Sequence, residues 1–393
     1  MKRILIIRFA LLLVCALSFD VAFAQDVRQK PVVKKQTTTT KQTTTTTKKQ
    51  TAMPPKKQTT TVITTKKTGQ IVIPCQWEVA LNFCEGLASV KDPNGKYGFI
   101  DKTGKVVIPC QWEFAFGFSE VGLAEVEDVN EKKGFINKTG QVVIPCQWKN
   151  ASAYHEGLAA VQDANSKWGF IDKTGKVVIP CQWKWIWGFH EELASVMDSN
   201  KKWGVIDKTG KVVIPCQWDD VGSFHEGLAR VKDANGNYGF IDKTGRLVIP
   251  CKLKWTMNFS EGMAWIQDSN EKRGYIDKTG QVVIPCQWKE AEDFHEGLAL
   301  VKDENDRFGF IDKTGQVVIP CKWEGAFNFC EGLACVKDTN GKNGFIDKSG
   351  KIVIPCKWDG AGVFCEGLAS VKDSNNKWGF IDKTGKMVKR HQE

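Results

Sequence analysis

A cysteine recurs in every copy of a repeated segment of the type VVIPCQW, directly after a proline. The nine cysteines are Cys75, Cys110, Cys146, Cys181, Cys216, Cys251, Cys286, Cys321 and Cys356. A thiol repeated in this way could serve metal ligation, disulfide bonding, redox chemistry or hydrophobic packing. Zinc sites use cysteines two to four residues apart, whereas the closest pair here, Cys330 and Cys335, is five apart. We therefore interpret the nine repeated cysteines as packed thiols, since free cysteine behaves as a small hydrophobic residue.

Four further cysteines, Cys84, Cys330, Cys335 and Cys365, lie outside the repeated segment. Each could pair with a nearby repeated cysteine, and the pairs we predict first are Cys356 with Cys365 and Cys321 with Cys330. Residues 25–393 hold 13 cysteines, an odd number, so they cannot all pair within one molecule. If the repeats form one continuous sheet, equivalent cysteines of successive repeats lie roughly 14 Å apart. A disulfide needs Cα atoms within about 7 Å, so repeat-to-repeat bonds are not expected.

A second position with ligand chemistry follows the aromatic residue of the motif FHEG, and a glutamate always comes next. Its nine occupants are Cys84, Ser119, His155, His190, His225, Ser260, His295, Cys330 and Cys365. The candidate metal ligands are His155, His190, His225 and His295. Ligands that share an ion must approach within about 4 Å, because metal–nitrogen bonds are near 2.1 Å, and the spacing of the repeats argues against this. We therefore favour a half-exposed turn and assign no metal and no other cofactor.

These residues belong to a repeat that fills most of the chain. The glycine of the motif KTG (KSG once) returns every 35 residues from Gly69 to Gly385, except for one 36-residue step in which Val121 is inserted. A fixed period in this range indicates a solenoid, a propeller or another tandem array.

One unit, residues 157–191, contains three apolar segments of strand length, GLAAVQD, KWGFIDK and KVVIPC. None has helical periodicity, and β-branched and aromatic residues dominate. Asp163 and Asn165 predict a hairpin turn after the first segment, and DKTG predicts a second hairpin with glycine in the left-handed conformation. We expect a three-stranded antiparallel meander whose buried third strand ends at the proline, which cannot donate to the ladder. The remaining residues have room for a short fourth strand or a helical turn.

The combination EGLAxVxD…KWGFIDKTGKVVIP resembles the WG-repeat family, named after the Trp-Gly pair at Trp168-Gly169, Trp203-Gly204 and Trp378-Gly379. The resemblance covers residues 68–393 and implies β-rich repeats without common catalytic residues. Lys133, Arg273 and Asn343 replace the aromatic residue, so we expect those units to be less well packed.

The nine repeats predict an all-β domain, either open or closed. The array begins with a third strand and ends after a second strand, an offset that would allow a propeller to close. However, nine units exceed the usual four to eight blades, and 35 residues are few for a four-stranded blade. We therefore favour an open superhelical array, with a closed β-propeller as the alternative.

The N-terminal residues predict export. Residues 1–24 have a basic start, an apolar core and small residues before a cleavage point, as in a secretory signal peptide. Residues 25–67 are rich in threonine, lysine and glutamine and predict a disordered linker. Residues 68–393 form the repeat domain. We expect a protein of the periplasm, the cell surface or the medium.

The net charge of +10 lies in the linker, which holds eleven Lys and Arg residues against the single Asp26. The repeat domain is nearly neutral, which argues against nucleic-acid binding. We expect a non-enzymatic binding or scaffold module at the cell envelope, with a protein or cell-wall glycan as partner and a peripheral electrostatic contact through residues 25–67. The alternative is a metal- or redox-active envelope protein that uses the Cys and His residues. Trp183, Trp185 and Trp187 could stack on sugars, but one tryptophan beside each apolar segment is more typical of a core.

Overall fold

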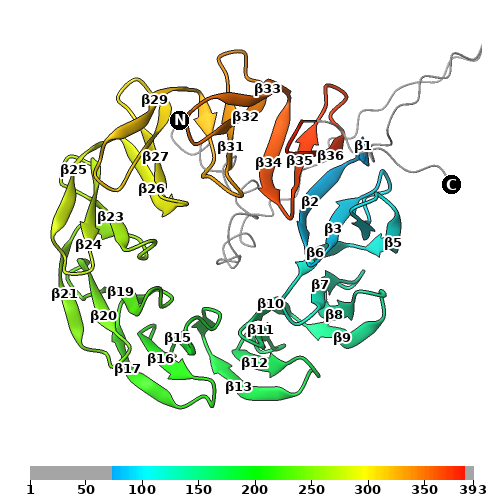
Figure 1. Ribbon diagram of the computed structural model, residues 1–393. Helices are drawn as coiled ribbons and strands as arrows, with labels where there is room; N and C mark the ends of the chain where they lie inside the picture. The colour runs from blue at the N-terminus through cyan, green and yellow to red at the C-terminus, as the bar shows by residue number, and fades with distance from the viewer. Residues whose placement is uncertain (1–72, 386–393) are drawn as a thin grey trace, which may run out of the picture.

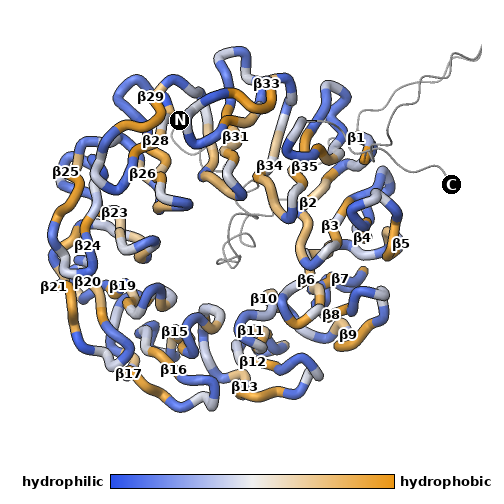
Figure 2. Tube along the Cα trace, in the orientation of Figure 1, coloured by the Kyte–Doolittle hydropathy of each residue, from blue (hydrophilic) through white to orange (hydrophobic). Residues whose placement is uncertain are grey.

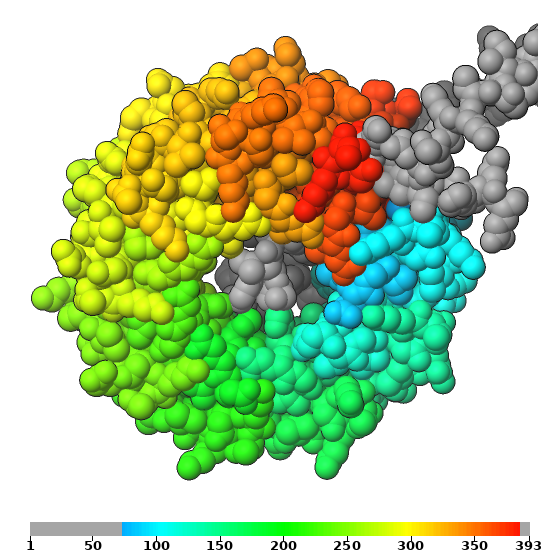
Figure 3. Space-filling view, in the orientation of Figure 1, coloured from blue at the N-terminus to red at the C-terminus, as the bar shows by residue number. Residues whose placement is uncertain are grey.

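The computed structural model describes residues 73–385, so the predicted signal peptide (1–24) and linker (25–67) lie outside the described residues. Nine four-stranded antiparallel sheets surround a central opening as the blades of a closed β-propeller (Figures 1 and 3). Within residues 73–385, no helix is long and apolar enough to cross a bilayer. Apolar residues follow the strands and hydrophilic residues the turns (Figure 2).

Each blade runs from an inner strand beside the central opening to an outer strand at the circumference (Figure 1). Blades 1 to 3 are β2 Val79–Cys84, β3 Leu87–Lys91, β4 Tyr97–Asp101, β5 Val106–Trp112; β6 Phe114–Phe118, β7 Leu123–Glu127, β8 Lys133–Asn137, β9 Val142–Trp148; and β10 Asn150–His155, β11 Leu158–Gln162, β12 Trp168–Asp172, β13 Val177–Trp183. Blades 4 to 6 are β14 Trp185–Ile186, β15 Leu193–Met197, β16 Trp203–Asp207, β17 Val212–Trp218; β18 Asp220–Val221, β19 Leu228–Lys232, β20 Tyr238–Asp242, β21 Leu247–Leu253; and β22 Trp255–Thr256, β23 Met263–Gln267, β24 Arg273–Asp277, β25 Val282–Trp288. Blades 7 to 9 are β26 Glu290–His295, β27 Leu298–Lys302, β28 Phe308–Ile311, β29 Val317–Trp323; β30 Gly325–Ala326, β31 Leu333–Lys337, β32 Asn343–Asp347, β33 Ile352–Trp358; and β34 Gly360–Cys365, β35 Leu368–Lys372, β36 Trp378–Asp382 with β1 Ile73–Trp77.

The open array favoured from the sequence is wrong, because the first strand closes the ring. Strand β1 pairs antiparallel with β36 and becomes the outer strand of blade 9, with Ile73 opposite Phe380 and Trp77 opposite Trp378. Thirty-five residues suffice for four strands because a single residue, such as Lys184, joins each outer strand to the next inner strand. The alternative of a closed propeller is therefore correct, and each repeat forms four strands rather than three.

The third predicted strand is the outer strand, and it continues through the proline. Strand β13 includes Pro180, and Val177 and Val178 are 43% and 38% exposed, whereas Ile179 is fully buried. An outer strand has one unpaired edge, so a residue without an N–H is tolerated there. The expectation of a buried strand that ends at proline was therefore wrong.

The glycine of the Trp-Gly pair permits a bulge in this outer strand. Trp168 pairs with Trp183 and Phe170 with Ile179, so the outer strand carries extra residues opposite Gly169. A Cβ atom on Gly169 would lie 2.4 Å from the carbonyl oxygen of Ile179. Only glycine allows the two backbones to approach this closely.

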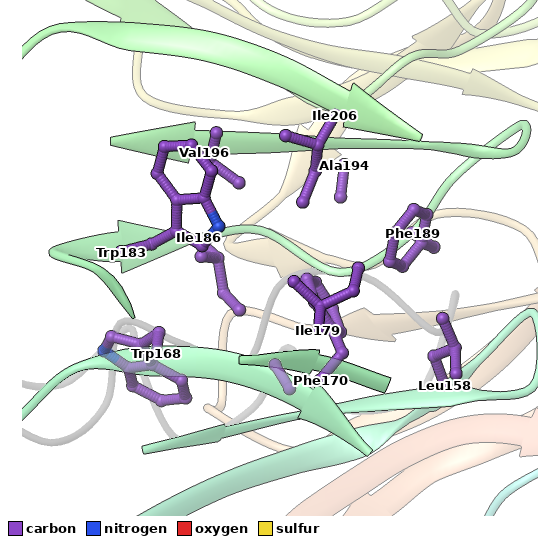
Figure 4. Packing of buried hydrophobic residues seen from close by; sticks show 11 residues of the cluster. Leu158, Trp168, Phe170, Ile179, Trp183, Ile186, Phe189, Ala194, Val196 and Ile206 are labelled. Atoms are coloured by element: carbon purple, nitrogen blue, oxygen red, sulfur yellow. The ribbon is translucent and has the colours of Figure 1, made fainter. Parts of the chain in front are cut away.

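The core lies between blades rather than inside them. Figure 4 shows one interface, where Phe170 and Trp183 of blade 3 meet Phe189 and Val196 of blade 4. The Phe170 and Phe189 rings have centroids 4.6 Å apart, and comparable ring pairs join seven further pairs of neighbouring blades. Such pairs contribute about 1 kcal/mol each beyond their buried area. Each blade therefore depends on both neighbours for its core.

The three residues that replace the aromatic of the Trp-Gly pair, Lys133, Arg273 and Asn343, make polar or cation–π contacts. The ammonium group of Lys133 is buried against Glu127, and the guanidinium group of Arg273 lies 4.1 Å from the ring centre of Trp265. The amide of Asn343 donates to the carbonyl oxygen of Trp358 at 3.3 Å.

Candidate functional site

The residue after the aromatic of FHEG stands where each inner strand turns into the second strand, and we call these nine positions the rim. His155, for example, ends β10 and pairs with Leu158 at the start of β11. The two turn residues that follow, Glu156 and Gly157, have φ of 51° and 85°. Two left-handed residues in succession are typical of a tight type I′ hairpin, and this turn places the rim side chains at one end of the inner strands.

The propeller brings three rim histidines together. The ring centroids of His155 and His190 are 4.9 Å apart, and those of His190 and His225 are 5.3 Å apart. The expectation that the repeat spacing would keep them apart was therefore wrong, because the blades pack face to face and do not form a continuous sheet. Across residues 73–385, however, no three His, Cys, Asp or Glu side chains are grouped as a metal site requires. His295 lies two blades beyond His225, with Ser260 between them.

This contact makes His190 difficult to protonate. Burial, together with the neighbouring His155 and His225, lowers the pKa of His190 from 6.5 to about 4, although Glu156 and Glu191 act in the opposite direction. Near neutral pH the three rings therefore form a row of tilted contacts whose central member is uncharged.

Ring closure also brings three rim cysteines into succession. The thiol of Cys365 is hydrogen-bonded to Cys84 across the contact between blades 9 and 1, and Cys330 adjoins Cys365 on the other side. The pairs predicted from the sequence are placed differently: Cys356 is in outer strand β33 and Cys321 in outer strand β29, whereas their proposed partners lie at the rim of the next blade. No disulfide joins the cysteines of residues 73–385.

Cys335 is a separate case, buried in the second strand of blade 8. Its thiol lies 3.9 Å from both the carbonyl oxygen of Ala361 and the amide oxygen of Asn343, and burial raises its pKa far above the ordinary value.

The cysteines of the outer strands are half-buried. The sulfur of Cys181 lies 3.8 Å from the carbonyl oxygen of Val161 in its own blade. Cys216 packs against the core between blades 3 and 4. Burial, followed by the charge of Asp92, raises the pKa of Cys110 to about 11. These thiols are therefore poorly suited to nucleophilic chemistry near neutral pH.

The glutamates that follow the rim residues link neighbouring blades. Glu261 accepts a hydrogen bond of 3.0 Å from the backbone N–H of Gly297 in the next blade, and the Lys313 ammonium group lies 3.1 Å from the same carboxylate. Such carboxylate–amide links occur at eight of the nine contacts between blades. The insertion of Val121 lies in the turn at the ninth contact, where Glu85 instead pairs with Lys138.

The inner strands differ from repeat to repeat where the other strands are nearly copied. The six-residue segments that begin with each inner strand and end at its rim residue are VALNFC, FAFGFS, NASAYH, WIWGFH, DVGSFH, WTMNFS, EAEDFH, GAFNFC and GAGVFC. The second and fifth residues stay apolar or small and pack between blades, while the first, third and fourth vary. Of the tryptophans considered for sugar stacking, Trp183 is buried. Trp187 stacks on Trp203, with ring centroids 6.0 Å apart and ring planes 12° apart.

Sequence reasoning missed a mixed aromatic and charged surface on the inner ends of blades 5 and 6, which we call the Trp255 patch: Asp220, Arg230, Trp255 and Met257. Trp255 and Met257 are 41% and 37% exposed, and all other large apolar side chains of residues 73–385 with comparable exposure lie on outer strands or, for Val129, in a turn. The Arg230 guanidinium group lies 2.8 Å from Asp220 and 6.0 Å from the ring centre of Trp255. The variation of the inner-strand residues within an otherwise constant repeat is the signal that could have identified it.

The comparisons with known proteins place this architecture in a family. No curated protein matches the chain. Similar solved structures include the computationally designed Ika8 protein (11% identity, 80% of this chain and 100% of that chain, TM-score 0.45), BamB from Moraxella catarrhalis (10%, 80% and 99%, 0.40) and Saccharomyces cerevisiae Sqt1 (9%, 72% and 98%, 0.41). The model of the WG containing repeat matches nine consecutive segments: 66–97, 97–132, 134–168, 168–202, 203–238, 238–272, 274–306, 308–342 and 344–378. The chain therefore belongs to the WG-repeat family.

Proposed function

We propose that the protein is an exported, non-enzymatic binding module of the cell envelope, and that a protein partner docks on the Trp255 patch. The observation that carries this proposal is the exposure of Trp255 on inner strand β22 and of Met257 directly after it, away from the apolar residues of the outer strands. Repeated residues hold the ring together, whereas the inner-strand residues that vary are available to distinguish one partner from another. Propellers and other repeat proteins offer broad, rigid surfaces for such contacts.

The composition of the patch favours a protein over a glycan. Tryptophan, methionine and arginine are enriched in protein interfaces, and tryptophan and arginine are also enriched in their energetic hot spots. The Nη1 atom of Arg230 lies 3.2 Å from the sulfur of Met257 and donates to the carbonyl oxygen of Thr256, so the guanidinium group is already held in place. A sugar-binding platform would need open aromatic faces, but Trp187 already stacks on Trp203.

A photocrosslinking experiment tests the docking site. A photoreactive phenylalanine analogue replaces Met257, and in a control protein it replaces Val213, an exposed residue of outer strand β17. We expect a discrete protein adduct at position 257 that is lost when Trp255→Ala is added and when excess unlabelled chain competes. Equal adducts at both positions would refute the site. Retention on isolated cell wall that is lost after glycan hydrolysis, without a protein adduct, would favour a glycan partner instead.

Export and the role of the linker are tested separately. Mass spectrometry of the chain from its native host should show an N-terminus at Gln25, and a retained residue 1 in the mature protein would contradict export by cleavage. Retention of 25–393 on envelope fractions should fall with rising salt more steeply than that of 68–393, because exposed charges are screened over about 10 Å at 0.1 M salt. Equal salt dependence would leave residues 25–67 only a spacer.

A further inference from the structure

The geometry points to a disulfide site between Cys84 and Cys365 that locks the propeller closed. It does not depend on the proposed binding function. The site joins the rim of blade 1 to the rim of blade 9, two segments that meet only because the ring is closed.

The contact between the two cysteines is part of a larger set of interactions at the same place. The Cys365 thiol is hydrogen-bonded to Cys84. Directly beside it, the Glu366 carboxylate accepts the backbone N–H of Gly86 at 3.1 Å and lies 2.8 Å from the ammonium group of Lys102. Blade 9 is thus held against blade 1 directly beside the thiol pair. Equivalent rim side chains elsewhere in the ring approach similarly closely, as the 4.9 Å between the rings of His155 and His190 shows.

A bond at this contact would have an effect that no other rim bond could have. Other neighbouring blades are joined through the backbone by one residue, such as Lys184. Blade 9 is attached to the start of the domain only by non-covalent contacts: the pairing of β36 with β1, packing, and the hydrogen bond and ion pair of Glu366. If β1 separates from β36, it stays attached to blade 1, and Cys84 moves away from Cys365. A Cys84–Cys365 bond therefore makes the closure covalent.

The reaction is a thiol–disulfide exchange with a low-molecular-weight disulfide, RSSR. One cysteine thiolate attacks RSSR, forms a mixed disulfide and expels RS⁻; the second thiolate attacks the protein sulfur of that mixed disulfide and expels the second RS⁻. The two cysteines lose two electrons and two protons, and RSSR is reduced to two RSH. The hydrogen bond to Cys84 and burial raise the pKa of Cys365, so the exchange should accelerate as pH rises above neutrality.

The chain supplies its own conservative variants. Ser119 and Ser260 occupy the rim in blades 2 and 6, so serine at position 84, 330 or 365 fits the same turn. The purified full chain is oxidised with glutathione disulfide at pH 8.5 and alkylated. It is then digested with trypsin and a glutamate-specific protease that cuts at Glu78, between Cys75 and Cys84. We expect one linked peptide pair, Cys84 with Cys365, in the wild type and in Cys330→Ser, and none in Cys84→Ser or Cys365→Ser.

A thermal measurement tests the structural consequence. Oxidation should raise the Tm of the wild type and of Cys330→Ser by several degrees, reversibly with reductant, and should leave the Tm of Cys365→Ser unchanged. The proposal is overturned if the wild-type map shows glutathione adducts alone or a Cys330–Cys365 bond. It is also overturned if the Cys84–Cys365 bond forms without a change in Tm, because the closure would then gain nothing from it. The peptide map of the wild type needs no variant, so a misfolded variant cannot obscure the result.

Discussion

The outer-strand cysteine and the rim residue recur with the same period of 35 residues, but they meet different neighbours. At the rim, His155 contacts His190, and Cys365 contacts Cys84. On the outer strand, the Cys181 sulfur lies against the backbone of its own blade. Because the blades radiate from an axis, the distance between equivalent atoms grows with their distance from that axis. An outer strand lies three strand spacings, about 14 Å, beyond the inner strand. Equivalent side chains therefore meet only near the centre.

The largest effect that we predict comes from a glycine beside the outer strand, which we compare with a glycine between an inner strand and its rim residue. Gly169→Ala should lower the free energy of unfolding by about 3 kcal/mol, because the new methyl group would lie 2.4 Å from the carbonyl oxygen of Ile179. Gly188→Ala should change it little, since the nearest atom is 3.8 Å away, on His155, and blade 3 has Ala153 at the equivalent position. Urea denaturation of both variants measures the difference, and equal losses would show that the outer-strand bulge is not the constraint.

The second prediction concerns pH and the row of three rim histidines. The pKa of His190 is about 4 in the folded protein, against 6.5 ordinarily, because of burial and of His155 and His225. The unfolded chain therefore binds the proton more readily, and the stability that neutral His190 contributes is lost as pH falls from about 6.5 towards 4. The loss between pH 7 and pH 4 should be about 3 kcal/mol, since one pKa unit corresponds to about 1.4 kcal/mol.

His190→Ser should flatten this dependence, as measured from Tm or urea midpoints between pH 7 and pH 4. His295→Ser is the control for burial alone, because burial also lowers the pKa of His295 but its rim neighbours, Ser260 and Cys330, are not histidines. An identical slope in the wild type and in His190→Ser would rule out His190 as the origin of the pH dependence.

The third prediction concerns the links between blades near the rim. Glu261→Gln should cost about 1 kcal/mol, because it weakens the bond from Gly297 and removes the ion pair with Lys313. Glu120→Gln should cost less, since Glu120 accepts one bond of 3.3 Å from Gly157 and is paired with none of the described lysines. Chemical denaturation in low and high salt separates the ionic part, which should shrink in 1 M salt. If Glu120→Gln proves the more costly, the lysine is not what strengthens the link.

The smallest predicted effect comes from replacing a cysteine, and it differs between the outer strand and the rim. Cys216→Ser should cost roughly 0.5 kcal/mol, because it places a hydroxyl where the sulfur packs against the core between blades 3 and 4. Cys84→Ser, measured under reducing conditions, should be nearly neutral, since serine already occupies the rim in two blades. The reverse order would mean that the rim thiol is needed for the fold itself.

The sequence predicted the all-β repeat, the hairpins and three strands of each unit, because turn residues such as Asp163 and Asn165 and the apolar strand residues are repeated. The Asp163 carboxylate accepts the backbone N–H of Lys167 at 2.8 Å, as expected of such a turn. The sequence did not decide whether a fourth strand forms, because the residues of this inner strand vary from repeat to repeat. Closure depends on the pairing of Ile73 with Phe380, which no local pattern can reveal.

The rim contacts were missed for a related reason. The expected separation of His155, His190 and His225 rested on a continuous sheet, in which equivalent residues lie a whole repeat apart. In a ring of separate sheets the relevant distance is set by the radius. The sequence shows the 35-residue period of the repeat, but the distance of the rim residues from the propeller axis follows only from the closed fold.

The pairing of β1 with β36 also bears on how the chain can change in length. The closing strand stands at a fixed phase of the repeat, so a duplication or deletion of one whole 35-residue unit by unequal recombination leaves that phase intact. The product would still begin with an outer strand and end with the three strands that receive it. The number of blades can thus change by one at a time while the pairing of the first and last strands is kept. Selection can then act on the diameter of the central opening.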